Sequence, residues 1–221
     1  MGEQPFAGNA RVGKPLLDRW EQALIARYVP RIPPWLQTYH LTLLSLVWSG
    51  LVLWFSWRAR GNLQWLWGSS AAIVCQYLTD IFDGAVGRHR HTGLVRWGYY
   101  MDHLLDFIFL CALGIGYAWL MPASIRMHLV AIMLAFAGAM ASTYLAFNVT
   151  SEFRMSHFRI GPTELRIALL TINTLLICSE GFRRGLETAV PAALAVSLAA
   201  LGVVVYRTQR RIWDMDMADR K

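Results

Sequence analysis

Charged residues are scarce in this sequence. Only 16% of its 221 residues are Asp, Glu, Lys or Arg, whereas soluble domains average about 25%. Hydrophobic residues make up 56% of the chain, and ten residues are Trp. A composition this apolar excludes an ordinary soluble domain and indicates a membrane protein.

Cysteine is equally sparse. The three cysteines, Cys75, Cys111 and Cys178, all fall in apolar stretches and lack the spacing of metal ligands. This excludes a cysteine-based zinc site, and we interpret the three residues as small apolar side chains.

Signals for cleavage, for internal repetition and for a separate soluble domain are also missing. The opening segment MGEQPFAGNARVGKPLLDRWEQ is polar, so we expect no cleavable signal peptide. We expect one domain over residues 1–221, made of a cytoplasmic N-terminal segment (1–35), a helical bundle (36–206) and a cytoplasmic tail (207–221).

Six apolar stretches are each long enough to cross about 30 Å of hydrocarbon as a helix. They occupy residues 38–57, 64–82, 98–121, 126–148, 163–179 and 190–206. Before them, the segment KPLLDRWEQALIARYV places Trp20, Leu24 and Tyr28 near one helical face, which indicates a helix on the membrane surface. The predicted fold is therefore all-α, with six transmembrane helices preceded by an amphipathic cytoplasmic surface helix.

Lys and Arg are distributed unevenly between the two ends of these stretches. With both tails on one side, that side carries 16 of the 21 Lys and Arg residues and the other side carries 5. Because positive charge is retained in the cytoplasm, we expect an integral, multi-pass membrane protein with both termini in the cytoplasm. The net charge of +7 is then an orientation signal, and we expect no nucleic-acid partner.

Four aspartates stand at the edges of two neighbouring apolar stretches. Asp80 and Asp83 are three residues apart and Asp102 and Asp106 are four apart, so each pair lies on one face of its own helix. Consecutive spans are antiparallel, so the two pairs can meet near the cytoplasmic surface. Four like charges there need a positive counterpart, and oxygen ligands suit Mg²⁺, Mn²⁺ or Ca²⁺. The alternative is that the first pair merely caps a helix end in water.

Small residues accompany these acids. Gly84 and Gly87 follow the first pair, and Gly98 stands one turn before the second. Glycines clear space beside the carboxylates, and Arg88 offers a planar fork that suits phosphate oxygens. A channel of this kind fits a metal-bound diphosphate, although close helix packing also explains the glycines.

The whole stretch resembles the signature of the CDP-alcohol phosphotransferase family, D-x2-D-G-x2-A-R-x8-G-x3-D-x3-D. The residues on its fixed positions are Asp80, Asp83, Gly84, Arg88, Gly98, Asp102 and Asp106. Gly87 stands where the family has Ala, and nine residues rather than eight separate Arg88 from Gly98. The extra residue lengthens the cytoplasmic loop and leaves both helical pairs in phase.

The resemblance implies a six-helix membrane enzyme of phospholipid synthesis, usually a homodimer, that displaces CMP from a CDP-linked alcohol. The attacking group is the hydroxyl of a second alcohol, and one of the two substrates is normally a membrane lipid. The resemblance implies two divalent metals, Mg²⁺ or Mn²⁺, held by Asp80, Asp83 and Asp102. It gives Asp106 the role of a further metal ligand or of the catalytic base. The residues that it places against the CDP portion are Asp80, Gly84, Arg88 and Gly98.

Weaker likenesses concern the branch of the family. GPTE at 161–164 and MDH at 101–103 resemble the choline/ethanolamine phosphotransferases, in which a CDP-headgroup is the donor and diacylglycerol the acceptor. Candidate acceptor or phosphate contacts are Arg166, His103 and Glu164. Glu164 alternatively fits the first turn of a helix, and His103 points about 100° away from the carboxylate face, as a packing residue can. Tyr99 stands where that branch carries an acidic residue.

The sequence therefore leaves several functions open. A soluble CDP-headgroup donor with a diradylglycerol acceptor is slightly preferred over CDP-diacylglycerol with a polar acceptor such as serine, glycerol phosphate or inositol phosphate. The competitor from another class is a divalent-cation transporter, in which acids in the spans line an ion path. Gly138 and Ser142 are small residues that would permit close packing in the expected homodimer.

Overall fold

The computed structural model describes residues 18–150 and 162–218, and this part of the chain is helical without strands. Helix α1 (Asp18–Tyr28) leads through a short 3₁₀ turn, η2 (Val29–Arg31), to six long helices. These are α2 (Thr38–Ala59), α3 (Leu66–His89) after the turn η3 (Leu63–Trp65), α4 (Val95–Leu120), α5 (Ala123–Thr150), α6 (Pro162–Cys178) and α7 (Glu180–Ala218). The all-α class that the sequence predicts is confirmed.

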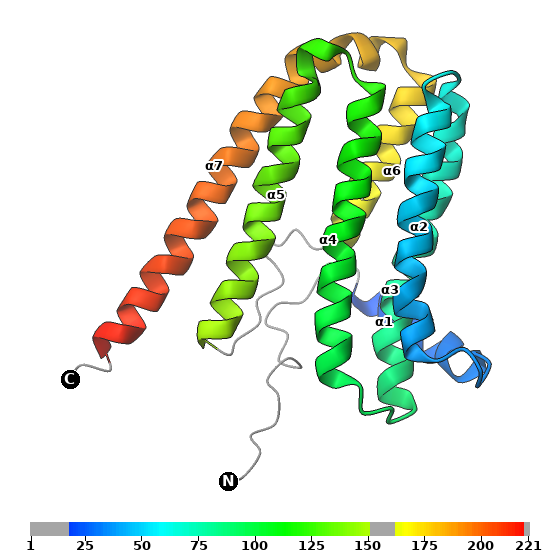
Figure 1. Ribbon diagram of the computed structural model, residues 1–221, viewed down its shortest axis with the longest axis vertical. Helices are drawn as coiled ribbons and strands as arrows, with labels where there is room; N and C mark the ends of the chain where they lie inside the picture. Colours follow the sequence, from blue (N-terminus) through cyan, green and yellow to red (C-terminus); the bar gives the residue numbers. More distant parts are fainter. Residues whose placement is uncertain (1–17, 151–161, 219–221) are drawn as a thin grey trace.

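The long helices form one bundle that runs along the long axis of the molecule (Figure 1). Helix α2 packs against both α3 and α4, α6 packs against α3, and α5 lies between α4 and α7. Helix α1, the α3–α4 turn and the end of α7 all lie at one end of the bundle (Figure 1). The tight turns after α2, α4 and α6 lie at the other end.

Each predicted apolar stretch coincides with one long helix, but the helices differ in how apolar they are. Among the described residues, four helices are long and apolar enough to cross a membrane: α2, α4, α5 and α7. Helix α6 has only 17 residues, and α3 is interrupted by polar side chains. Those polar side chains point inward, since Ser69, Ser70 and Gln76 are all buried. Helices α3 and α6 therefore contribute buried polar residues to the bundle interior, as α2 also does.

The turn between α3 and α4 accommodates the lengthened loop of the motif. His91 and Gly93 both have positive φ angles, 52° and 70°, which reverses the chain within a few residues. The guanidinium of Arg90 donates hydrogen bonds to the carbonyl oxygens of Ile32 (2.7 Å) and Leu36 (2.8 Å). The turn is thus fastened to the segment that joins α1 to α2.

A helix, α1, is present where the sequence predicts one before the first apolar stretch, although its first predicted residues lie outside the described part of the chain. Trp20 and Tyr28 are 56% and 43% exposed, while Ile25 packs against the small apolar cluster of Val29, Leu41 and Val86. One face of α1 is therefore bound to the bundle and the other presents aromatic side chains.

Large apolar side chains are exposed along the outer helices. Examples on α5 and α7 are Leu134, Leu145, Val149, Val196 and Leu198, each more than half exposed. A surface of this kind suits contact with lipid and would be unfavourable in water. The apolar helices are those of an integral membrane protein.

Candidate active site

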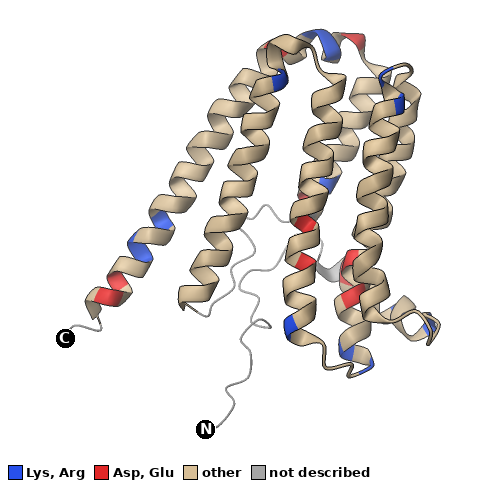
Figure 2. Ribbon diagram, viewed as in Figure 1, with Lys and Arg blue, Asp and Glu red and all other residues tan. Residues whose placement is uncertain are grey.

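The acidic residues of the motif lie on two neighbouring antiparallel helices. Asp80 and Asp83 are in the second half of α3, and Asp102 and Asp106 are near the start of α4. Figure 2 shows acidic side-chain positions on these two helices, toward the end of the bundle where α1 lies. The spacing in the sequence thus corresponds to one pair of acids on each of two neighbouring helices.

Three of the four carboxylates come together. Asp80, Asp102 and Asp106 each offer one ligand atom, and these atoms all lie within 4.8 Å of one another. Each of the three side chains is partly buried. We call these three residues the acid cluster.

The acid cluster fits a hard divalent cation. Mg²⁺ and Mn²⁺ prefer carboxylate oxygens, and oxygens bound to Mg²⁺ at about 2.1 Å stand roughly 3–4 Å apart. The spacing of the acid cluster is within reach of that geometry. Carboxylates this close repel one another, so a cation between them is the natural counterpart.

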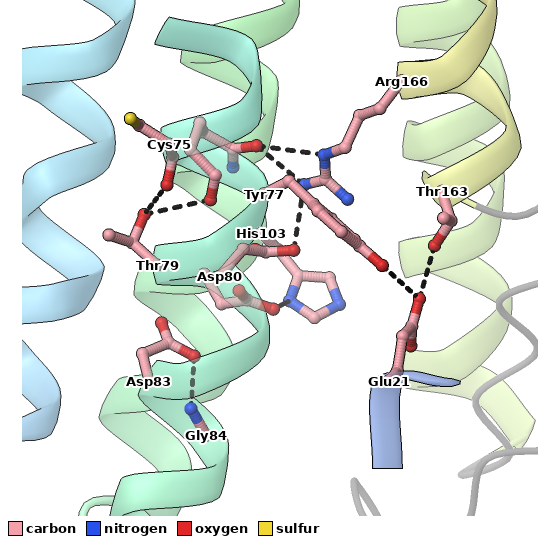
Figure 3. Close-up of polar contacts among 12 residues, drawn as sticks. Glu21, Cys75, Tyr77, Thr79, Asp80, Asp83, Gly84, His103, Thr163 and Arg166 are labelled. Carbon is pink, nitrogen blue, oxygen red and sulfur yellow. Dashed lines mark hydrogen bonds and ion pairs between the residues drawn. The ribbon is translucent and has the colours of Figure 1, made fainter. Parts of the chain in front are cut away.

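Asp83 is turned differently from the other three acids. Its side chain is only 8% exposed, and its Oδ2 accepts a hydrogen bond of 2.8 Å from the Thr42 hydroxyl on α2. Its other oxygen, Oδ1, accepts from the backbone N–H of Gly84. Both oxygens are therefore engaged by protein donors, of which Figure 3 shows the Gly84 N–H, and Asp83 is outside the acid cluster.

Arg166 is the residue of α6 that reaches the acid cluster. Its Nη2 lies 2.9 Å from Asp80 Oδ2, and its Nε and Nη2 donate to Gln76 Oε1 at 3.1 and 2.8 Å. Its guanidinium also lies over the ring of Tyr77, 5.1 Å from the ring centre. The side chain is 11% exposed, so this arginine is buried in the site rather than spread on the membrane surface.

Gln76 and Tyr77 are site residues that the sequence analysis missed. Gln76 is fully buried one turn before Asp80, and a single amide in an apolar run was the only signal. Its Nε2 makes no hydrogen bond of good geometry, although it lies near Asp106. Tyr77 is the next residue along α3, and its ring packs against the guanidinium of Arg166 (Figure 3).

The glycines of the motif differ in their surroundings. A Cβ atom on Gly87 would come within 3.1 Å of the Thr38 hydroxyl, so this glycine allows α3 to pack closely on α2. A Cβ atom on Gly84 would lie 3.2 Å from Arg88 Nη1, which places the arginine directly beside this glycine. No described atom lies within 4 Å of a Cβ built on Gly98. Close packing therefore explains Gly87 but does not explain Gly98.

His103 is placed by aromatic packing as well as by the acids. Its Nδ1 lies 2.8 Å from the backbone oxygen of Tyr99 and 3.4 Å from Asp102 Oδ2. Its ring lies 4.2 Å from that of Tyr99 and 5.0 Å from that of Tyr144 on α5, centre to centre. His103 therefore borders the acid cluster while it joins α4 to α5.

Glu164 lies in the first turn of α6, as a helix-start residue does. It is partly buried and is not a member of the acid cluster. The residues before it, from 151 to 161, lie outside the described part of the chain, including Gly161 of the GPTE segment. Of the three candidate acceptor contacts, Arg166 and His103 lie within 3.4 Å of members of the acid cluster, whereas Glu164 is known only by its place in the first turn of α6.

The fold and the acid cluster define a class of protein: a helical membrane protein whose facing carboxylates suit a divalent cation and a phosphorylated ligand. The family profile of the CDP-alcohol phosphatidyltransferases matches residues 35–206, and the chain belongs to this family. No curated protein matches the chain.

Family membership establishes the reaction class. The protein is a transferase of substituted phosphate groups that moves a phospho-alcohol from a CDP-alcohol to an alcohol acceptor in phospholipid synthesis. The reaction depends on a divalent metal, and the acid cluster supplies ligands of the right chemistry.

Proposed function

We propose that the acid cluster is the transfer site and that two divalent cations, Mg²⁺ or Mn²⁺, act there. The supporting observation is the convergence of Asp80, Asp102 and Asp106 from antiparallel helices within 4.8 Å. In this proposal the metal ligands are Asp80, Asp83 and Asp102, and Asp106 is either a further ligand or the base. The bound cations would supply charge neutralisation on the diphosphate.

The residues of the motif then have separable tasks in the transfer. The hydroxyl oxygen of the acceptor forms a bond to the phosphorus that carries the donor's alcohol, and the bond from that phosphorus to CMP breaks. If Asp106 is the base and not a further metal ligand, its carboxylate takes the proton of the hydroxyl. Arg88 and the space at Gly84 and Gly98 receive the CDP portion, because a guanidinium fork suits phosphate oxygens.

The second metal requires a change at Asp83. Both of its oxygens are hydrogen-bonded, one of them to Thr42 at 2.8 Å. To bind a cation with Asp80, Asp83 would give up at least one of these bonds, each of which contributes about 1.5–3 kcal/mol to a charged acceptor. A cation contact can offset this, so we propose that the second metal binds together with substrate.

The membrane arrangement that we propose has six spans, with the acid cluster and both termini on the cytoplasmic side. Exposed aromatic side chains gather near both ends of the bundle, as interfacial belts do. Near α1 they are Trp20, Tyr28, Trp35 and Tyr39, and at the opposite end they are Trp54, Trp57, Trp67 and Trp119. Helices α3 and α6 can span despite their polar residues because those residues face the interior.

A homodimer is part of the proposal, but its contact surface differs from the sequence expectation. A Cβ atom on Gly138 would lie 3.4 Å from Leu201 of α7. Gly138 therefore packs against α7 within the same chain and is not free for a second subunit. Mass measurement in a native-like detergent or nanodisc tests the dimer directly.

For the substrates, we propose a soluble CDP-headgroup donor and a diradylglycerol acceptor. Support comes from the GPTE segment, because the helix that begins there, α6, carries Arg166 to Asp80, and from His103 beside Asp102. The runner-up is CDP-diacylglycerol with a polar acceptor. A radiolabel screen of CDP-choline, CDP-ethanolamine and CDP-diacylglycerol, each against lipid and polar acceptors, decides between them by the labelled lipid that forms.

A divalent-cation transporter is the alternative from another class, because the acid cluster lies inside a bundle of membrane helices. The interior beyond the acid cluster is largely apolar, with clusters around Ile73 and Leu113 and around Leu66 and Ile125. The polar residues there, Ser70, Tyr117 and Asn173, hydrogen-bond to one another. Flux of Mn²⁺ into liposomes without CMP release would favour the transporter.

A further inference from the structure

Glu21 on the surface helix α1 has two hydrogen bonds that the proposed reaction does not explain. Its Oε1 accepts from the hydroxyl of Tyr77 on α3 at 2.8 Å and from the hydroxyl of Thr163 on α6 at 2.6 Å. One carboxylate oxygen therefore joins three helices that are far apart in the sequence (Figure 3). Short bonds to a charged acceptor are the stronger kind of side-chain hydrogen bond.

Both donors are related to Arg166, Tyr77 by direct contact and Thr163 by its position on the same helix. The ring of Tyr77 lies under the guanidinium, 5.1 Å from Cζ. Thr163 precedes Arg166 by three residues on α6, so the two side chains share a helical face. Arg166 in turn contacts Asp80 of the acid cluster at 2.9 Å. A continuous series of contacts thus runs from Glu21 through Tyr77 and Arg166 to Asp80, a ligand of the proposed metal site. Thr163 joins Glu21 to the helix that carries Arg166.

We propose that Glu21 is a positioning residue of the transferase site, which holds Arg166 against Asp80. The inference rests on the proposed function of the acid cluster. Arginine has several rotatable bonds, and its fork is effective only when neighbouring contacts fix its plane. Gln76 fixes one edge of the guanidinium and Tyr77 fixes its face. Glu21 fixes Tyr77, since it is the acceptor for the phenol hydroxyl.

Glu21 affects the proposed reaction through the orientation of the Asp80 carboxylate. With Arg166 on Oδ2, the Asp80 carboxylate is held in one orientation toward Asp102 and Asp106. Loss of Glu21 leaves the charge of Arg166 in place but releases its orientation, so Asp80 becomes a poorer ligand. A purely structural role of Glu21, in which it only fastens α1 to the bundle, predicts lower stability with no change in metal binding.

The experiment compares Glu21→Ala, Glu21→Gln and Tyr77→Phe with the unchanged protein, all in nanodiscs. Gln22→Ala is the matched control, because Gln22 is exposed on the same helix. The measurements are Mn²⁺ affinity by electron paramagnetic resonance, kcat and acceptor KM for CMP release, and Tm. Tyr77→Phe keeps the ring under Arg166 and removes only the bond to Glu21, so it serves if Glu21→Ala does not fold.

We expect Glu21→Ala to weaken Mn²⁺ binding about fivefold and to lower kcat roughly tenfold, with acceptor KM unchanged. Tyr77→Phe should act in the same direction and more weakly. Glu21→Gln should keep most of both properties, because its amide oxygen still accepts from both hydroxyls. In an Arg166→Lys background, Glu21→Ala should add less than about a twofold loss, since the two residues act through the same contact.

The proposal is overturned if Glu21→Ala lowers Tm but leaves Mn²⁺ affinity and kcat at the level of Gln22→Ala. It is also overturned if the fold-losses in Mn²⁺ affinity and kcat that Glu21→Ala and Arg166→Lys cause separately multiply in the double variant. If the unchanged protein releases no CMP from any CDP-alcohol, the proposed function fails, and the Mn²⁺ measurements alone then decide the role of Glu21.

Discussion

Replacement of Asp106 by Asn should make the metal-free protein more stable and the enzyme inactive. At 4.8 Å, two carboxylates repel by about 3.5 kcal/mol at an effective dielectric constant near 20. Asp106 lies within that distance of both Asp80 and Asp102, so the substitution removes two of three repulsive pairs. Arg166 and the partial exposure of the side chains offset much of this, which leaves a net gain of about 1–3 kcal/mol.

The assay is thermal unfolding in nanodiscs, in EDTA and in Mn²⁺. For a chain of this length, about 1 kcal/mol corresponds to a shift of 2–4 °C, so Asp106→Asn should raise Tm in EDTA by about 2–12 °C. Mn²⁺ should raise the Tm of the unchanged protein and have little effect on the variant. Asp214→Asn is the control, because Asp214 is an exposed acid on α7 that pairs with Arg210. A lower Tm of Asp106→Asn in EDTA, or a full Mn²⁺ response, would refute the electrostatic account of the acid cluster.

Three further predictions concern neighbouring positions. Gly98→Leu should raise the KM for the CDP-alcohol at least tenfold with an unchanged Tm, because no described atom lies within 4 Å of a Cβ on Gly98 and the proposed CDP site includes this position; steady-state kinetics with an unaltered KM would contradict this. Gly87→Val should lower Tm instead, since its Cβ would press on Thr38 at 3.1 Å, and an unfolding scan detects it. Asn173→Leu should cost about 1–3 kcal/mol, because the partners of Asn173 lose their hydrogen bonds in the interior. The kcat per folded molecule should stay the same in Asn173→Leu, and a large loss of kcat would mean that the mid-bundle polar residues take part in the reaction.

The sequence was sufficient to predict the helices and the facing acids. Hydrophobic length located all six long helices, although among the described residues only α2, α4, α5 and α7 are long and apolar enough to cross a membrane. The spacings of three and four residues predicted that each acid pair shares a face, and antiparallel neighbours then bring Asp80, Asp102 and Asp106 together. These features depend on local periodicity, which a single sequence displays directly.

Contacts between distant helices could not be predicted in the same way. Asp83 matches the motif as well as the other acids do, yet it faces Thr42 because of how α2 is placed against α3. Arg166 was a candidate for phosphate binding, but its contact with Asp80 depends on the packing of α6 on α3. Glu21 was not among the candidate site residues that the sequence offered. Its two donors belong to α3 and α6, and no local pattern encodes that meeting.

The two motif glycines illustrate the same limit. Gly87 and Gly98 both fit the idea of cleared space around a diphosphate, and both fit the idea of close helix packing. Only the neighbouring atoms distinguish them, since a Cβ on Gly87 meets Thr38 and a Cβ on Gly98 meets no described atom.

The central claim is that Asp80, Asp102 and Asp106 form a metal-dependent site for phospho-alcohol transfer. CMP release by the purified protein in nanodiscs, with a panel of CDP-alcohols and acceptors, tests it most directly. We predict CMP release in Mg²⁺ or Mn²⁺, none in EDTA, and a fall to background in Asp102→Asn although that variant folds. Release of CMP that persists in EDTA, or turnover by Asp102→Asn at the level of the unchanged protein, would contradict the claim.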